Sequence, residues 1–163
     1  MKRFGVDGAD VRIIAKLYWE QRALVRVDNG RSGWVNIERG VRQGCVLSPN
    51  LFNVYTEKIF KEFKDLPGVK MFGEYINNLR YADDTVLLAE SEDELQTLVN
   101  AVKEGSLKYG LEMNTKKTKT MVIRKDINEV VNVKIKVDGV ILEQVEKYQY
   151  SEQIITEDCR CEN

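Results

Sequence analysis

Residues 80–90 read RYADDTVLLAE, and they place two adjacent aspartates, Asp83 and Asp84, between two apolar runs. Branched and aromatic residues favour strands and aspartate favours turns, so the stretch predicts a strand, a tight turn and a second strand. The flanking runs are apolar enough for buried strands, which would hold the acidic tip rigidly. A rigid tip of carboxylates suits a divalent cation. The stretch alone leaves a ligand-free, solvent-exposed turn open as the alternative.

Two neighbouring strand residues point to opposite faces, so this pair is badly placed to clamp one ion symmetrically. We therefore expect one aspartate to be the main ligand, joined by a carboxylate from a neighbouring strand. The chain contains no histidine. Ser-His and Cys-His nucleophile pairs and the usual zinc sites are thereby excluded. Any metal chemistry must use carboxylates, which favour Mg²⁺ or Mn²⁺.

Length and composition indicate one globular domain: 163 residues, 43% hydrophobic and 31% charged. No apolar run approaches the ~20 residues of a membrane span, so we expect no membrane partner. Three cysteines make a disulfide framework improbable for a chain of this kind, and we expect an intracellular protein.

Charge is unevenly distributed although the net charge is only -1. Residues 114–125, NTKKTKTMVIRK, hold cations and no acid. A local basic patch can bind phosphate without raising the total charge, and a solvated surface is the alternative. The five cations of this phosphate-binding patch are Lys116, Lys117, Lys119, Arg124 and Lys125.

The first half of the chain predicts a helix, a hairpin and a second helix. The first helix covers residues 10–21, with Asp7 or Asp10 as its cap. The hairpin covers residues 23–37, with Asn29-Gly30 as its turn. In the second helix, Ser48 is the expected N-cap and Pro49 the first helical residue. Its expected buried face consists of Phe52, Tyr55, Ile59 and Phe63.

The second half predicts the acidic hairpin, one long helix and short strands. Ser91 and Glu94 form a capping box for the helix, and Gly110 is its expected stop. Its expected apolar face consists of Leu95, Leu98, Val99 and Val102. Strands are expected at residues 119–123 and on both sides of Asp138-Gly139. Because helices and strands alternate without a regular parallel pattern, the fold class is α+β, an antiparallel sheet backed by helices.

Three segments carry a resemblance to a known family: GVRQGCVLSPNLFN (40–53), RYADDTVLLAES (80–91) and GLEMNTKKTKTMVI (110–123). Their order and approximate spacing resemble those of reverse transcriptases, most closely the enzymes of LINE-type (non-long-terminal-repeat) retrotransposons. The likeness runs nearly the whole length of the chain. It implies a polymerase palm with a ferredoxin-like antiparallel sheet and helices on one side.

The resemblance also implies roles for individual residues. Asp83 and Asp84 match the catalytic, metal-binding pair, with Asp83 as the principal ligand. Lys117 matches a lysine near the leaving pyrophosphate, with Lys116 as a substitute. The implied nucleotide- and template-binding residues are Gln43 and Gly44 in a loop, Ser48 and Pro49 at the start of the helix behind it, and Tyr81 and Ala82 under the primer end.

The implied function is part of an RNA-directed DNA polymerase that transfers nucleotides by a two-metal mechanism. The implied cofactor is Mg²⁺, with Mn²⁺ as a substitute. The implied partners are an RNA template, a DNA primer, deoxynucleoside triphosphates and the remaining parts of a parent polyprotein.

Two departures from the family pattern shape the expected activity. The second metal-binding aspartate of the family falls upstream of Met1, and the nearest substitutes, Asp7 and Asp10, fit better as helix caps. Residues 147–158, KYQYSEQIITED, replace a Tyr-Leu-Gly-Ser stretch, and Cys159 stands where a turn glycine is common.

We expect residues 1–125 to be a partial palm and residues 126–163 a connection toward a thumb that the chain lacks. The chain alone should be inactive, and a non-catalytic retroelement remnant that binds nucleic acid weakly is the alternative.

Overall fold

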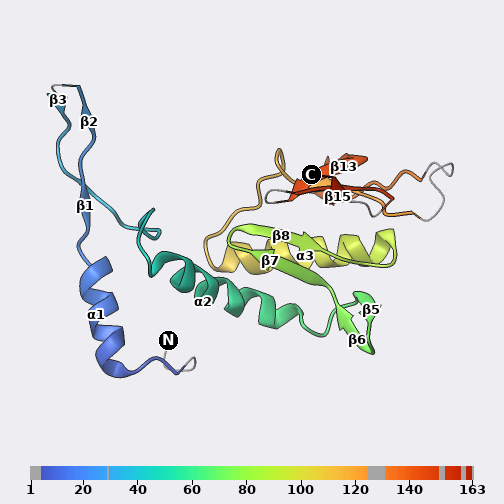
Figure 1. Cartoon of the computed structure of the whole chain (residues 1–163), viewed down its shortest axis with the longest axis horizontal. Coiled ribbons are helices and arrows are strands. Elements are labelled where there is room, and N and C mark those ends of the chain that lie inside the picture. The colour runs from blue at the N-terminus through green and yellow to red at the C-terminus, as the bar shows by residue number, and fades with distance from the viewer. Residues whose placement is uncertain (1–4, 29, 125–130, 151–152, 159–160, 163) are drawn as a thin grey trace. The chain divides into compact units, whose positions relative to one another are not determined.

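The structure is a computed structural model that describes residues 5–28, 30–124, 131–150, 153–158 and 161–162 (Figure 1). The chain divides into two compact units, Met1–Glu57 and Lys58–Asn163. The division expected at residue 125 concerns parts of a longer protein and stays a prediction.

Helix α1, Gly8–Tyr18, opens the first unit, somewhat earlier than the predicted span. The Asp7 carboxylate accepts a hydrogen bond from Gly8 N at 2.6 Å, which confirms Asp7 as the cap. The helix ends where Trp19 N donates to Ala15 O at 2.8 Å. Gln21 then anchors the exit, because its buried side chain donates to Leu17 O and its carbonyl accepts from Ile37 N, both at 2.8 Å.

The predicted hairpin is present, with its turn one residue earlier than expected. Strand β1, Arg22–Ala23, pairs antiparallel with β4, Val35–Asn36. Strand β2, Arg26–Val27, pairs antiparallel with β3, Gly30–Arg31. Because Val27 faces Gly30, Asp28 is the first turn residue, and its φ of 48° lies in the left-handed region that aspartate tolerates. Asn29 lies outside the described residues.

Helix α2, Ser48–Phe60, spans the boundary between the units and continues into the 3-10 helix η2, Lys61–Phe63. The expected cap was wrong by one position. Leu51 N donates to Leu47 O at 3.0 Å, so Leu47 is the N-cap and Ser48 the first helical residue. The Ser48 hydroxyl instead donates to Arg42 O at 2.5 Å. The expected apolar face is confirmed in part: Ile59 and Phe63 are buried, Phe52 is half-buried and Tyr55 is exposed.

Two antiparallel hairpins follow in the second unit. Strand β5, Val69–Met71, pairs with β6, Glu74–Ile76. Strand β7, Asn78–Tyr81, pairs with β8, Asp84–Leu87. The buried Asn77 side chain donates to Phe63 O at 2.8 Å and to Leu66 O at 3.1 Å. These bonds tie the hairpins to the end of η2 and to the turn after it, where the Phe63 carbonyl also accepts from Leu66 N at 3.1 Å.

Helix α3, Glu92–Lys108, has the predicted N-cap and stop, and the predicted capping box is confirmed in part, because Glu94 accepts from the N–H of Glu90 and not from that of Ser91. Ser91 Oγ accepts from Glu94 N at 3.3 Å, and the Glu94 carboxylate accepts from Glu90 N at 3.1 Å. At the other end Gly110, with φ 68°, completes a Schellman motif. The motif's two bonds run from Leu111 N to Ser106 O and from Gly110 N to Leu107 O.

The core of the second unit lies on the predicted face of α3. One cluster joins Ile59, Phe60 and Phe63 to Val102, and another joins Val99 to Ile135, Val137 and Leu142. Leu87 of β8 contacts both clusters, so the hairpin base rests on the core that α3 organises (Figure 1).

Short strands complete the second unit. Strand β9, Lys119–Thr120, pairs parallel with β12, Glu143–Gln144. Strand β10, Lys136–Val137, and β11, Val140–Ile141, enclose the predicted turn, where Asp138 and Gly139 have φ 53° and 78°. The last antiparallel sheet consists of β13, Lys147–Tyr150, β14, Gln153–Thr156, and β15, Cys161–Glu162.

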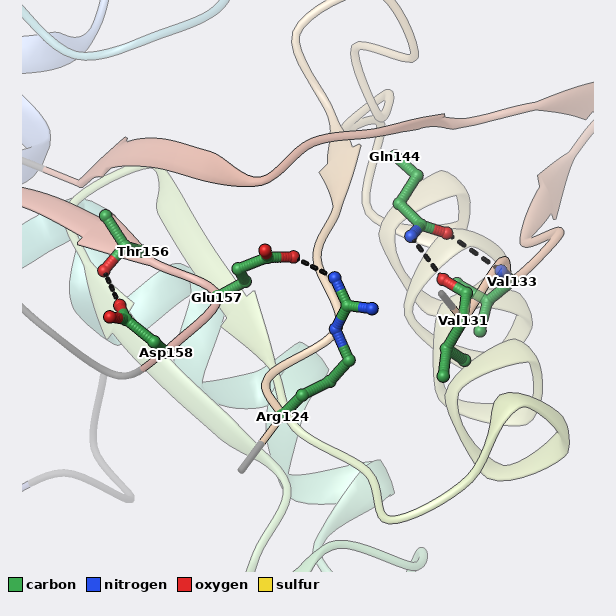
Figure 2. A network of polar contacts seen from close by, with 7 residues as sticks. All are labelled: Arg124, Val131, Val133, Gln144, Thr156, Glu157 and Asp158. Atoms are coloured by element: carbon green, nitrogen blue, oxygen red, sulfur yellow. Dashed lines mark hydrogen bonds and ion pairs between the residues drawn. The ribbon is translucent and has the colours of Figure 1, made fainter. Parts of the chain in front are cut away.

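Two glutamine side chains replace backbone partners around residues 131–136. Gln96 accepts from Lys136 N at 2.7 Å and donates to Lys136 O at 2.8 Å. Gln144 accepts from Val133 N at 2.9 Å and donates to Val131 O at 2.7 Å (Figure 2). The amide groups thus supply ladder-like hydrogen bonds where strand pairing is short.

The fold is therefore a small mixed arrangement of helices and mainly antiparallel strands. Over the residues that the structure describes, the strands form separate two- and three-stranded sheets, and no single sheet joins them. The ferredoxin-like palm sheet stays a prediction. Within the same residues, no helix has both the length and the apolar character needed to cross a membrane.

Candidate active site

The β7–β8 hairpin places both aspartates at one tip. Tyr81 pairs with Asp84, so Ala82 and Asp83 form the turn and Asp84 begins β8. Ala82 has φ 52°, a conformation that costs a residue with a Cβ about 1–2 kcal/mol. Strained backbone of this kind is often found at functional sites. The prediction of a tight acidic turn is confirmed, with Asp83 at its centre.

The expected burial of the flanking strands was wrong. Leu79 is 50% exposed and Tyr81 is 65% exposed, and within the two strands only Asn78 at the start of β7 and the end of β8 are half-buried. The hairpin is anchored at its base instead: Leu88 N donates to Asn77 O at 2.9 Å. The Arg80 guanidinium lies 4.6 Å from the centre of the Phe60 ring. An apolar run predicts burial only where another element covers it, and in the described chain the middle of this hairpin is uncovered.

Asp83 and Asp84 are exposed carboxylates with the donor chemistry that Mg²⁺ or Mn²⁺ requires. Within the described residues, however, no group of three or more His, Cys, Asp or Glu side chains is placed to hold a metal ion. Asp7 is engaged as a helix cap. The donor type of Asp83 and Asp84 fits a divalent ion.

The second candidate region, Gln43-Gly44, forms a tight turn in the first unit. Cys45 N donates to Arg42 O at 3.3 Å, which closes a four-residue turn with Gln43 and Gly44 at its centre. Gly44 has φ 78°, as the third residue of a type II turn requires. Apart from the two chain neighbours, no atom of the described residues lies within 4 Å of a Cβ built on Gly44, so this face of the turn is open to them. Both residues are exposed.

A side-chain cluster that sequence reasoning missed holds this turn. The Tyr18 hydroxyl lies 3.4 Å from Cys45 Sγ and 3.0 Å from Ser48 Oγ. The hydrogen bond that Tyr18 donates lowers the pKa of the Cys45 thiol, and the backbone N–H groups of Leu47 and Ser48 act in the same direction. Tyr18 belongs to the expected helix, but nothing in its spacing points to residues 45 and 48.

The basic segment divides into exposed and ion-paired cations. A turn closed by bonds to Asn114 O, from Lys117 N at 3.1 Å and Thr118 N at 2.9 Å, presents Lys116 and Lys117 to solvent. Lys119 forms an ion pair with Glu143 at 2.5 Å. Lys125 lies outside the described residues.

Arg124 forms an ion pair with Glu157, and its side chain is only 13% exposed (Figure 2). Its backbone N–H also donates to Glu157 O at 2.9 Å. This acid lies in the acidic end of the chain, next to Asp158, which accepts from the Thr156 hydroxyl. Ser151, Glu152 and Cys159, which mark departures from the family pattern, lie outside the described residues.

The structure thus gathers the predicted metal-, nucleotide- and template-binding residues into two places, and the basic segment forms a third. Tyr81, Ala82, Asp83 and Asp84 share one hairpin of the second unit. Gln43, Gly44, Ser48 and Pro49 share one turn and helix start of the first unit.

Comparison with known proteins gives a family. The model of the family "Reverse transcriptase (RNA-dependent DNA polymerase)" matches residues 1–151. A Pol polyprotein from a type-1 R2 retrotransposable element of Nasonia vitripennis is 35% identical over 107 residues, 66% of this chain and 10% of that protein. The R2 polyprotein of Popillia japonica is 30% identical over 121 residues, 72% of this chain and 17% of that protein.

A third relative widens the coverage. The RNA-directed DNA polymerase from the mobile element jockey of Drosophila funebris is 26% identical over 148 residues, 84% of this chain and 15% of that protein. The chain therefore spans less than a fifth of the length of each of these three relatives. Because the family model covers most of the chain, the chain belongs to the reverse transcriptase family, among the enzymes of LINE-type retrotransposons.

Proposed function

We propose that this chain is the part of an RNA-directed DNA polymerase that carries the catalytic aspartates on the β7–β8 hairpin. The observation that carries the proposal is the exposed, strained turn at Ala82-Asp83, in a chain whose family is reverse transcriptase. The proposed setting is a palm whose ferredoxin-like sheet contains this hairpin. The substrates are an RNA template, a DNA primer and deoxynucleoside triphosphates, and the rest of the site belongs to a longer polyprotein.

Asp83 is the proposed principal metal ligand because it occupies the turn itself, where its carboxylate is exposed. Asp84 is the first residue of β8 and pairs with Tyr81, and it is proposed to contribute less. When bound there, Mg²⁺ would stabilise the charge of the attacking 3′-oxygen and of the leaving oxygen. Tyr81 and Ala82, in the same hairpin, are proposed to support the primer end.

Lys116 and Lys117 are the proposed contacts to phosphate. They are exposed on the Asn114 turn, and Lys117 is the proposed partner of the leaving pyrophosphate. Lys119 and Arg124 contribute less, because a phosphate would have to compete with Glu143 and Glu157. The proposed location of the protein is intracellular.

An assay of DNA synthesis tests two statements together: the assignment of Asp83, and the expectation that this chain alone is inactive. With only two adjacent carboxylates at the tip, we expect the chain alone to extend no DNA primer on an RNA template. Incorporation of labelled nucleotide that disappears in an Asp83→Ala variant would contradict the expected inactivity of the chain but support the assignment of Asp83. Incorporation that survives Asp83→Ala would contradict the assignment.

Binding of a primed RNA template tests the substrate class. Each neutralised phosphate contributes roughly 0.7–0.9 unit to the slope of log affinity against log salt, so Lys116→Ala with Lys117→Ala should flatten that slope by up to about two units. Lys119→Ala is the matched control, because an ion-paired lysine should change the slope by less than one unit. An unchanged slope in the double variant would show that the segment is only a solvated surface.

A non-catalytic nucleic-acid binder is the second candidate function. The observation that favours it is the lack of a three-ligand metal group among the described residues. It predicts template binding that divalent metal and Asp83 do not affect. Metal-dependent binding that is lost in Asp83→Asn would exclude it.

A further inference from the structure

The loop before α2 is held by one hydroxyl from α1. Ser48 Oγ donates its single proton to Arg42 O at 2.5 Å. The 3.0 Å contact between Tyr18 and Ser48 therefore needs the proton of Tyr18. The same proton points to Cys45 Sγ at 3.4 Å, so Tyr18 shares one proton between the sulfur and the serine oxygen.

These bonds enclose the Gln43-Gly44 turn from both sides. Arg42 precedes the turn and is fixed by Ser48, whereas Cys45 follows it and is fixed by Tyr18. A second backbone bond, from Ser48 N to Cys45 O at 3.0 Å, joins the turn to the helix. Ser48 is buried, so water has little access to its hydroxyl. If the Tyr18 hydroxyl were lost, Ser48 Oγ would lose the proton that it accepts, and water would replace that donor poorly.

The turn itself has little other support. Gln43, Gly44 and Val46 are exposed, and no atom of the described residues outside the immediate chain neighbours lies within 4 Å of a Cβ built on Gly44. A turn held by few contacts opens locally at low cost, so one hydrogen-bonded anchor has a large influence on its geometry.

We infer that Tyr18 is a positioning residue for the Gln43-Gly44 turn, which its hydroxyl holds through Cys45 and Ser48 in the geometry that receives the template–nucleotide base pair. The inference rests on the proposed function, because Gln43 has its contact with the template and the incoming nucleotide only as the resemblance to reverse transcriptases implies it. Tyr18 itself touches the turn's flanks and acts on the substrate only through them.

Local readouts on the 163-residue chain test the anchor. Tyr18→Phe removes only the hydroxyl, and we expect the amides of Cys45 and Ser48, which donate to Arg42 O and Cys45 O, to exchange hydrogen several-fold faster, since a net hydrogen bond changes an opening equilibrium roughly fivefold. Tyr75→Phe, which removes an exposed hydroxyl in the other unit, is the matched control and should leave both amides unchanged. Unchanged exchange in Tyr18→Phe would overturn the inference.

The ionisation of Cys45 gives an independent signature. The Tyr18 hydroxyl lowers the pKa of this thiol, so Tyr18→Phe should move the midpoint of Cys45 alkylation to higher pH. Peptide mapping by mass spectrometry separates Cys45 from Cys159 and Cys161. A midpoint that stays in place would overturn the assigned hydrogen bond, whatever the chain binds.

Binding of a primed RNA template then connects the anchor to function. Tyr18→Phe and Gln43→Ala should each weaken binding, by roughly fivefold for one lost hydrogen bond, and the double variant should be no weaker than Gln43→Ala alone. Fully additive losses would overturn the inference, and so would full affinity in Tyr18→Phe. If the wild-type chain bound no primed template, the proposed function would fail, and the binding role of Tyr18 with it, whereas the exchange and alkylation results would still decide the anchor.

Discussion

Different interactions stabilise the interior of each of the two units. In Lys58–Asn163, helix α3 organises two apolar clusters, and Ile59, Leu98 and Ile135 are almost completely buried. In Met1–Glu57, helix α1 has no buried residue, and the buried side chains that the structure describes there are Gln21, Ser48 and Thr56. The second unit is stabilised mainly by burial of apolar surface, whereas the first relies on hydrogen bonds and exposes apolar side chains such as Trp34.

This difference separates stability from the candidate chemistry. Most of the predicted site residues lie on exposed tips and turns, with the buried Ser48 and the half-buried Lys119 and Arg124 as exceptions, and the apolar core residues lie elsewhere. Residues on exposed loops are free to contact a substrate, but they contribute little apolar burial. We therefore expect core substitutions to change the stability of the second unit, and site substitutions to change binding with little loss of stability.

The largest expected effect follows from shortening a core side chain. Leu98 is 1% exposed, so Leu98→Ala should destabilise the second unit by about 2–5 kcal/mol. Leu17→Ala, at a residue that is 43% exposed on α1, is the matched control and should cost about 0.5 kcal/mol or less. Urea unfolding followed by circular dichroism measures both changes.

Hydrogen exchange in Leu98→Ala also tests the separation of the units. Amides of α3 should lose protection while those of α1 keep theirs. Equal loss of protection in both helices would show that the two units unfold as one.

A smaller loss of stability is expected from a substitution at Gly105, where α3 packs against Phe63 of η2. A Cβ built on Gly105 would lie 2.3 Å from Phe63 Cζ and 3.4 Å from Ile59 Cγ2. Overpacking of this kind costs about 1–3 kcal/mol, and the better helix propensity of alanine returns about 1 kcal/mol. Gly105→Ala should therefore destabilise the chain in thermal unfolding, whereas Glu104→Ala at the exposed neighbouring position should be nearly neutral. A more stable Gly105→Ala chain would mean that Phe63 moves aside freely.

The smallest change in stability, a gain instead of a loss, is expected at the tip of the β7–β8 hairpin. Ala82 has φ 52°, so Ala82→Gly removes about 1–2 kcal/mol of strain and adds about 0.5–1 kcal/mol of backbone entropy cost. A net stabilisation of about 0.5–1 kcal/mol should appear in denaturant unfolding. A destabilised variant would show that the alanine methyl group makes a contact that compensates its strain.

Local sequence signals predicted the helix caps and tight turns, which depend on hydrogen bonds or dihedral angles within a few residues of the chain. The Asp7 cap, the Ser91 cap, the Gly110 stop and the turn at Asp138-Gly139 are confirmed, because each rests on dihedral angles or on bonds within a few residues. The apolar face of α3 is confirmed for the same reason: Leu98, Val99 and Val102 follow the helical period.

Contacts between distant segments were not predictable in this way. The exposed middle of β7–β8 depends on which element covers a strand, and no local pattern encodes that. Tyr18 reaches residues 45 and 48, and Gln96 reaches Lys136, across separations that periodicity does not address. Asn77 had one usable signal, since a buried polar side chain beside apolar residues must find partners, and it finds the carbonyls of Phe63 and Leu66.

Paramagnetic broadening by Mn²⁺ in the NMR spectrum of the 163-residue chain tests most directly whether Asp83 is the principal metal ligand. We predict weak binding, in roughly the millimolar range, with the strongest broadening at the amides of residues 82–84. Asp83→Asn should abolish this local effect, Asp84→Asn should reduce it, and Asp28→Asn in the hairpin turn of the other unit should leave it unchanged. Broadening that is strongest elsewhere, or that survives Asp83→Asn, would contradict the assignment of Asp83.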